Sequence, residues 1–412
     1  MIKTMSIARN YRLLQNLRIK SASGPFLVDV CNTLYYDLSS CYSAANFGHN
    51  NIFLKEKLIN QLDKISVCSR YVDNVYLNNL GHMVHKYFGN LINLKAGEKT
   101  CTLPSSNGVD AVETAIKLAR AWGYAQKNIK EDQCKILFAN GNFAGRTILA
   151  SSVSSNAYQK KFYPKVPGFD LINYNDIESL KKYLDTNDSK NISAICLEPI
   201  QGENGVIIPN DDYFPQVREL CDKHNLLLIC DEIQTGLGRT SKLLCSEHYN
   251  IKPDIVLLGK SLGGGFLPVS LCISSNTIMD NILPGEHGST FGGNPLASRM
   301  ATEVLEYYHS NYIQQNIRTL STTFAKYGEQ LYEKYNGKLI KNVRGKGLFW
   351  GIEFIPKYDA FTVAQMLTEY NIITNSAGNN TLRICPPFIL NNHEAKQIYD
   401  LLNECFDDIL AL

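Results

Sequence analysis

The stretches Leu226-Leu-Leu-Ile-Cys-Asp231 and Pro253-Asp-Ile-Val-Leu-Leu-Gly-Lys260 decide the fold class of this chain. Each is a short apolar run that ends on one ionisable residue. Bounded apolar runs of this length are typical of fully buried strands in a parallel sheet. Because open α/β sheets bind their ligands at the carboxyl ends of such strands, we expect Asp231 and Lys260 to face the same ligand.

This acid and this amine indicate a cofactor that has an aldehyde and a pyridine ring. A lysine removed from water is a common partner of a carbonyl group in a Schiff base. A carboxylate beside the pyridinium nitrogen keeps pyridoxal phosphate poor in electrons. The alternative of a dinucleotide-binding loop at Gly259–Gly265 does not fit the Gly-x-Gly-x-x-Gly pattern.

The composition is that of a globular protein with a large core. The chain has 412 residues, of which 44% are hydrophobic and 19% charged, and its formal net charge is +2. We therefore expect no nucleic acid as a partner, and no apolar run reaches the roughly 18 residues of a membrane span. The 12 cysteines include no Cys-x-x-Cys pair, which favours core thiols in a reducing compartment. His82 and His85 have no acid or cysteine beside them, so we expect no metal site.

The first 28 residues carry basic side chains and no acid. This is the charge pattern of a transit peptide, but it also fits a basic N-terminal arm. We favour the arm, and with it a cytoplasmic location over a mitochondrial one.

The pattern between residues 100 and 310 predicts an α/β fold. Apolar strand candidates alternate there with helical stretches, as in a mostly parallel central sheet with helices on both faces. The strand candidates are Lys135–Ala139, Ala194–Leu197, Leu226–Cys230, Ile255–Leu258 and Val269–Ile273, and two of the helices are Asp176–Asp188 and Asp211–Asn225. A long helical pattern then starts near Pro295 and runs past Tyr308.

A smaller α+β region follows this large domain. Its strand candidates are Gly347–Phe354 and Thr381–Ile384, and its helices lie near Ala360–Tyr370 and from His393 onward. Two short strand patterns precede the large domain, between residues 26 and 45. We therefore predict three parts, which are an N-terminal segment at 1–45 that packs with the small domain, a large cofactor-binding domain at 46–305 and a small domain at 306–412.

Three loops beside predicted helices carry candidate binding residues. Ser105-Ser-Asn-Gly-Val109 precedes a helix and is either a phosphate site or a plain helix cap. Asn140-Gly-Asn-Phe-Ala-Gly-Arg146 offers an aromatic ring for stacking and an arginine for a carboxylate, or is an ordinary surface loop. His287-Gly-Ser-Thr-Phe-Gly-Gly-Asn-Pro295 offers a threonine to phosphate, or is a flexible connection.

Five motifs in this order resemble those of the class III, fold-type I aminotransferases that use pyridoxal phosphate. They are Glu198-Pro-Ile-Gln-Gly-Glu203, Asp231-Glu-Ile-Gln-Thr-Gly236, Leu258-Gly-Lys260, Gly288-Ser-Thr-Phe-Gly-Gly-Asn-Pro295 and Arg344-Gly-Lys-Gly-Leu348. The resemblance covers about residues 26–412 and implies the fold-type I architecture. Within the family, the segments Gly141–Thr147, Ile233–Thr240 and Pro284–Thr290 are most similar to the ornithine aminotransferases.

The resemblance implies roles around the ring of pyridoxal 5'-phosphate. Lys260 would hold the aldehyde and then move the substrate proton, and Asp231 would hold the proton of the ring nitrogen. Gln234 would bond the ring hydroxyl, and Phe143 would stack on the ring.

At the phosphate, the resemblance implies contacts from Asn107, Gly108 and Val109, although asparagine stands where the family usually has threonine. Thr290 would reach the phosphate of the neighbouring subunit. The active unit would therefore be a homodimer with shared active sites.

On the substrate side, Arg383 resembles the arginine that binds the α-carboxylate of 2-oxoglutarate, and Glu203 the acid that masks it while ornithine is bound. An unmasked arginine would seize the α-carboxylate of ornithine and present the wrong amine. Arg146 would hold the remaining carboxylate, and Tyr42 and Tyr11 match substrate-contacting tyrosines.

The function implied is ornithine δ-aminotransferase, which would place the chain in amino-acid metabolism such as proline biosynthesis. Alternatives are relatives that act on N-acetylornithine, 4-aminobutyrate or lysine, and a non-catalytic dimeric paralogue. Departures from the family pattern include an extra or shifted Cys41 and a segment Asn10–Asn16 without the usual prolines. They affect substrate identity more than reaction type.

Overall fold

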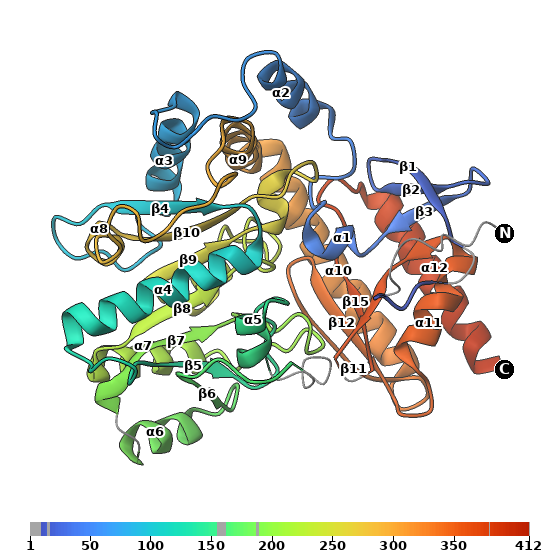
Figure 1. Cartoon of the computed structure of the whole chain (residues 1–412). Coiled ribbons are helices and arrows are strands. Elements are labelled where there is room, and N and C mark those ends of the chain that lie inside the picture. Colours follow the sequence, from blue (N-terminus) through green and yellow to red (C-terminus); the bar gives the residue numbers. More distant parts are fainter. Residues whose placement is uncertain (1–9, 15–16, 155–161, 187–188, 379, 412) are drawn as a thin grey trace.

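The computed structural model describes residues 10–14, 17–154, 162–186, 189–378 and 380–411. The first nine residues of the predicted N-terminal arm lie outside this part of the chain. The centre is a seven-stranded sheet with the order β4-β10-β9-β8-β7-β5-β6 (Figure 1). Its strands are β4 (Thr100–Ser105), β5 (Lys135–Ala139), β6 (Phe169–Ile172), β7 (Ile192–Leu197), β8 (Leu227–Asp231), β9 (Ile255–Leu258) and β10 (Ser270–Ser275).

The strands from β9 to β6 are parallel to their neighbours, and β10 runs antiparallel to both β9 and β4. This confirms the mostly parallel sheet. Every residue of β7, β8, β9 and β10 is buried, which explains why these strands appear in the sequence as apolar runs. The edge strands β4 and β6 were not predicted, because polar residues such as Asp170 interrupt their pattern.

Helices cover both faces of this sheet, as predicted. On one face, α4 and α5 form an apolar cluster with Phe138 and Ile229. On the other face, α6 and α7 form a cluster with Leu137 and Leu228. These helices are α4 (Gly108–Lys127), α5 (Ile148–Val153), α6 (Ile177–Thr186) and α7 (Tyr213–His224).

A third apolar cluster joins helices at the β4 edge to the C-terminal part of the chain. The long helical pattern predicted from Pro295 is two helices, since α9 ends at Tyr308 and α10 begins at Asn311. Ser310 separates them, because its hydroxyl accepts from the N–H of Ile313 and caps α10. The helices of this region are α2 (Ile52–Leu62), α3 (Val75–Phe88), α9 (Pro295–Tyr308) and α10 (Asn311–Tyr335), while α8 (Asn276–Met279) packs in the cluster of α4 and α5.

Two four-stranded sheets lie on one side of the molecule, next to α10, α11 (Ala360–Met366) and α12 (Asn392–Ala411) (Figure 1). Their orders are β1-β2-β3-β13 and β11-β12-β15-β14. The first sheet joins N-terminal strands to the C-terminal part of the chain, while the division into domains at residues 45 and 305 stays a prediction. The strands are β1 (Ile19–Ser23), β2 (Phe26–Asp29), β3 (Leu34–Asp37), β11 (Ile340–Lys346), β12 (Phe349–Phe354), β13 (Ile372–Ile373), β14 (Asn375–Ala377) and β15 (Thr381–Ile384).

Three properties of the described residues bear on the class of protein. No helix among them is both long and apolar enough to cross a membrane. No cluster of three or more His, Cys, Asp or Glu side chains among them could hold a metal ion. The 12 cysteines are free thiols, and most of them are buried in the core, as predicted.

One buried arginine connects three segments that are distant in sequence. The side chain of Arg239 is fully buried. Its Nη1 donates to the carbonyl oxygens of Leu348 and Pro386, both at 2.8 Å, and its Nη2 donates to Oδ1 of Asn46. Burial lowers the pKa of Arg239 to about 10. This guanidinium therefore ties Asn46, the β11–β12 turn and the segment after β15 to the loop after β8.

We expect Arg239→Met to lower the free energy of unfolding by about 3 kcal/mol, because it leaves three buried acceptors without a donor. Chemical denaturation followed by circular dichroism measures this change. Arg318→Met, at an exposed arginine of α10, is the control and should cost about 0.5 kcal/mol or less. Equal effects of the two substitutions would contradict the role given to Arg239.

Candidate active site

The carboxyl ends of β7, β8 and β9 bring three ionisable side chains together. Asp231 is the last residue of β8, and Lys260 follows the end of β9 by two residues. Glu198 follows β7, whose last residue Leu197 pairs with the residue before Asp231. The structure thus places the predicted acid and amine at the carboxyl ends of two neighbouring strands, β8 and β9.

Burial shifts the pKa of both groups toward neutrality. It raises the pKa of Asp231 to about 6. The N–H of Ile233, which donates to Oδ1 at 3.0 Å, and the charge of Lys260 lower this pKa, but the effect of burial is larger. Burial and, after it, the charge of Arg383 lower the pKa of Lys260 to about 8. At neutral pH the acid is mostly ionised and roughly a tenth of the amine is neutral, far more than for an ordinary lysine, which suits a nucleophilic lysine.

Glu198 belongs to this site, although the sequence analysis gave it no role. Its Oε1 accepts from the backbone N–H of Phe143 at 2.9 Å. Burial, and then the charge of Asp231, raise the pKa of Glu198 to about 8. It is therefore mostly protonated at neutral pH and leaves Asp231 as the charged acid at the strand ends. The signal in the sequence was its position directly after a buried strand, which it shares with Asp231.

The start of α4 forms a cradle that suits a phosphate. Asn107 caps the helix, since its Oδ1 accepts from the N–H of Asp110 at 3.2 Å, and its carbonyl accepts from the hydroxyl of Ser270 at 2.6 Å. Gly108 and Val109 are the first two helical residues, so their N–H groups have no partner within the helix. These groups and the positive end of the helix dipole favour an anion here.

Phe143 and Arg146 lie together on the loop after β5, as predicted. The guanidinium carbon of Arg146 is 5.9 Å from the ring centroid of Phe143 and 5.9 Å from that of Tyr11. The amide of Gln234 donates to the carbonyl oxygen of Tyr42 at 3.5 Å. A Cβ at Gly202 would meet the amide end of Gln234, so a larger residue at position 202 would displace this side chain.

The predicted pair of Arg383 and Glu203 is an ion pair in the structure. Nη1 of Arg383 lies 2.7 Å from Oε1 of Glu203, and the arginine side chain is 0% exposed. Burial alone would raise the pKa of Glu203, but the Arg383 guanidinium lowers it below its usual value. The ring of Tyr42 is 5.4 Å from the guanidinium carbon, and Asn375 accepts from Nη2 at 2.6 Å when its amide oxygen faces the arginine. The arginine predicted to bind a carboxylate is thus covered by Glu203.

Tyr42 sits on a strained turn that sequence patterns do not predict. The four residues of α1 (Ser40–Ser43) all have positive φ values, between 43° and 71°. A left-handed turn of non-glycine residues costs roughly 1–2 kcal/mol per residue. Asp37 holds its start, since the carboxylate accepts from the N–H of Ser40 at 2.9 Å and contacts Nε2 of His49 at 2.8 Å. Strain of this kind is typical of functional sites.

Thr290 is the one predicted site residue that a single chain does not explain. It is exposed on the loop before α9. The neighbouring Ser289 hydroxyl lies 3.5 Å from that of Ser106, beside the helix cradle of its own chain. The predicted contact of Thr290 with a second subunit stays a prediction.

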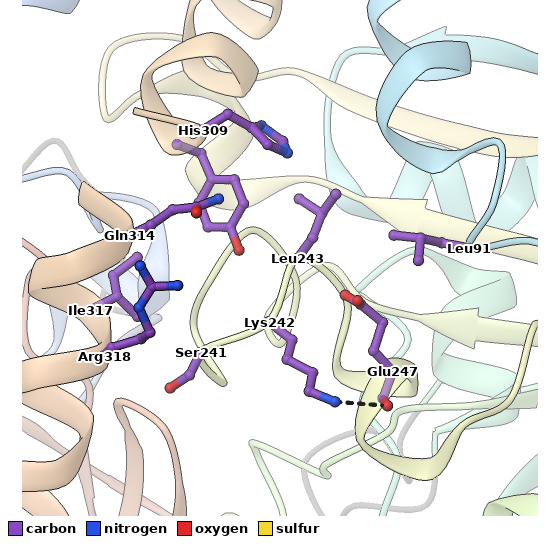
Figure 2. Close-up of a pocket in the computed structure, with 10 residues that line it drawn as sticks. Leu91, Ser241, Lys242, Leu243, Glu247, His309, Gln314, Ile317 and Arg318 are labelled. Atoms are coloured by element: carbon purple, nitrogen blue, oxygen red, sulfur yellow. Dashed lines mark hydrogen bonds between the residues drawn. The ribbon is translucent and has the colours of Figure 1, made fainter. Parts of the chain in front are cut away.

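A separate cavity of about 290 Å³ lies away from these residues (Figure 2). Lys242 and Glu247 line one side, and Gln314 and Arg318 of α10 line the other (Figure 2). Nζ of Lys242 already donates to the carbonyl oxygen of Glu247 at 3.0 Å. None of the predicted site residues lines this cavity, so it is not the candidate active site.

The strand-end residues together fit pyridoxal phosphate. Lys260 offers an amine of lowered pKa and Asp231 an acid in the same buried site. Gly108 and Val109 offer N–H groups at the helix start. An acid, an amine and an anion cradle are the groups that this cofactor requires.

The comparisons with known proteins agree with this arrangement. The family model for aminotransferase class-III matches residues 6–406. The ornithine aminotransferase of Saccharomyces cerevisiae is 40% identical over 414 residues, which cover 97% of this chain and 95% of the relative. A Toxoplasma gondii ornithine aminotransferase structure with partial occupancy of PLP at its active site superposes with a TM-score of 0.91, at 32% identity over 99% of this chain and 94% of that one. The structure of the acetylornithine aminotransferase from Elizabethkingia anophelis superposes with a TM-score of 0.84. It is 36% identical, and the match covers 97% of this chain and 96% of that one.

We expect Lys260 in the cofactor-free protein to react with acetic anhydride with a midpoint near pH 8, because only the neutral amine is nucleophilic. Labelling across pH, followed by mass spectrometry of the Lys260 peptide, measures this. In Asp231→Asn the midpoint should move to lower pH, since the lost carboxylate favoured the charged amine. A midpoint above about pH 10, the range of an ordinary lysine, would contradict the burial argument.

Proposed function

The chain belongs to the class III aminotransferases, and on that premise we propose that it transfers the δ-amino group of L-ornithine to 2-oxoglutarate. Members of this family bind pyridoxal phosphate. The products would be glutamate 5-semialdehyde and glutamate, formed in two half-reactions of a ping-pong cycle.

The observation that carries this proposal is the covered arginine. The guanidinium of Arg383 is fully buried and paired with Glu203 at 2.7 Å. A free arginine there would bind the α-carboxylate of any amino acid donor and present its α-amine. Because Glu203 occupies it, a donor is favoured that offers its distal amine. 2-Oxoglutarate requires the same arginine uncovered, so Glu203 would have to turn away in the second half-reaction.

Around the cofactor, the proposed roles follow from position and charge. When bound, pyridoxal phosphate supplies the electron sink for the bond that is broken. Lys260 Nζ, with a pKa of about 8, would move the proton between the substrate carbon and the cofactor. Asp231, mostly ionised at neutral pH, would hold the proton of the ring nitrogen. Gln234 would bond the ring hydroxyl, and Phe143 would stack on the ring.

On the substrate side, we assign Arg146, Tyr11 and Tyr42 to the part of ornithine that carries the α-carbon. The side chain of Tyr11 is 56% exposed and that of Tyr42 is 40% exposed, so both surfaces remain open to a ligand. Arg146 would hold a carboxylate with its planar fork. Its position within 5.9 Å of the rings of Tyr11 and Phe143 supports this assignment.

We also propose a homodimer in which each subunit completes the active site of the other. The loop that carries Thr290 is exposed, and the adjacent Phe291 is 60% exposed. Leu283 on the same loop is 60% exposed and Val75 at the start of α3 is 64% exposed. Exposed large apolar side chains of this kind are typical of an interface.

A second candidate is N-acetylornithine as donor. The acetylornithine aminotransferase from Elizabethkingia anophelis is 36% identical and superposes over nearly the whole chain, which favours this candidate. Both donors present the same δ-amine. They differ at the α-nitrogen, which is charged in ornithine and is an amide in N-acetylornithine.

The half-reactions distinguish these donors. We expect the pyridoxal phosphate form of the protein to lose its visible absorbance when mixed with ornithine, and more slowly or not at all with N-acetylornithine, 4-aminobutyrate or lysine. Stopped-flow absorbance measures each rate without a second substrate. A faster reaction with N-acetylornithine than with ornithine would overturn the proposed donor.

The same panel on Tyr42→Ile tests the placement of the tyrosine. The substitution removes the aromatic ring near Arg383 and leaves an apolar surface. A donor without an α-amino group suits such a surface, so preference should move from ornithine toward 4-aminobutyrate. The same ratio of the two rates in both proteins would count against Tyr42 as a substrate contact.

A further inference from the structure

The short loop 202–206 carries Glu203, which forms the ion pair with Arg383. Contacts from other segments are needed to hold the backbone of this loop. Its base is closed by the backbones of Gln201 and Ile207, which exchange N–H···O bonds of 3.1 Å and 3.0 Å. Gly205 and Val206 both have positive φ, at 103° and 56°. Val206 is β-branched, and this conformation is unfavourable for such a residue. The loop conformation is therefore strained.

Arg344 of β11 supplies that support. Its Nε donates to the carbonyl oxygens of Gly205 at 3.1 Å and Val206 at 3.0 Å, and its Nη2 donates to Gly205 at 2.6 Å. Nη2 also donates to Oγ1 of Thr381 at 3.2 Å, and Nη1 donates to Oε2 of Glu353 at 2.6 Å. The planar fork thus binds two successive carbonyls of the loop while Glu353 and Thr381 fix its orientation.

Arg344 and Arg383, which both contact this loop, lie in one row of the small sheet, β11-β12-β15-β14. Arg344 pairs with Gly351 across β11 and β12, and Gly351 pairs with Arg383 across β12 and β15. Residues directly opposite one another share a face of the sheet. A Cβ on Gly351 would lie 3.1 Å from the carbonyl oxygen of Gly205, so the loop crosses the row above this glycine. Arg344 holds the loop backbone, and Arg383 holds the carboxylate of Glu203.

We propose that Arg344 is a positioning residue for the ion pair of Arg383 and Glu203, an inference that rests on the proposed function. It anchors the backbone of the loop to the sheet, so that Glu203 covers and uncovers Arg383 by rotation of its own side chain. Without this anchor the carboxylate leaves Arg383, which then binds the α-carboxylate of donors. The choice of the δ-amine over the α-amine therefore depends on Arg344.

Arg344→Lys tests this role, because lysine keeps a cation near Glu353 but lacks the planar fork. In the fully cofactor-loaded protein, we expect kcat/KM for ornithine relative to glutamate, an α-amine donor, to fall at least about tenfold. The absorbance of the bound cofactor and the midpoint of thermal unfolding should stay close to those of the unchanged protein. Lys341→Ala is the matched control, since Nζ of Lys341 binds the other oxygen of Glu353 at 2.6 Å, and it should leave the ratio unchanged.

Hydrogen exchange of the loop amides gives a second measurement that needs no substrate. Residues 202–206 should exchange faster in Arg344→Lys than in Lys341→Ala. A donor ratio equal to that of the control overturns the proposal, and so do loop amides that exchange no faster in Arg344→Lys than in Lys341→Ala. If the unchanged protein does not use ornithine, the proposed function fails, whereas the loop role is still decided by the exchange rates. Arg344→Gln, measured in the same way, replaces the lysine variant if that variant does not fold.

Discussion

The removal of two opposite charges from water at the ends of adjacent strands governs this site. Asp231 and Lys260 are brought together by the parallel pairing of β8 and β9, and helices on both faces of the sheet bury these two strands completely. Burial moves the pKa of the acid up to about 6 and that of the amine down to about 8. The same desolvation makes the lysine more nucleophilic, whereas the acid stays mostly ionised at neutral pH because the N–H of Ile233 and the charge of Lys260 oppose it.

In the proposed function, substrate choice depends on a second group of residues, which the four-stranded sheet β11-β12-β15-β14, the small sheet, carries. β15 places Arg383 where the loop after β7 can cover it with Glu203, and β11 places Arg344 where it holds that loop. The large sheet thus carries the residues proposed to bind the cofactor, and the small sheet carries the residues proposed to distinguish carboxylates. Arg239, on the loop after β8, binds Asn46, the β11–β12 turn and the segment after β15, and so connects the two sheets.

The parts that the sequence could predict are those encoded by local patterns. Apolar runs predicted the buried central strands, and the polar residue at the end of each run predicted Asp231 and Lys260. The edge strands and the role of Glu198 were missed, since neither has a local pattern of its own. The left-handed turn that carries Tyr42 depends on bonds from Asp37, and the role of Arg344 depends on a loop 139 residues away. A role for Thr290 requires a second chain.

The central claim is that Lys260 holds the pyridoxal phosphate in the buried site beside Asp231. Borohydride reduction of the cofactor-loaded protein fixes the cofactor to whichever amine holds it, and mass spectrometry of the peptides locates the adduct. We expect a pyridoxyl group on the peptide that contains Lys260 and on no other lysine. An adduct on a different lysine, or none after reduction of the loaded protein, would contradict it.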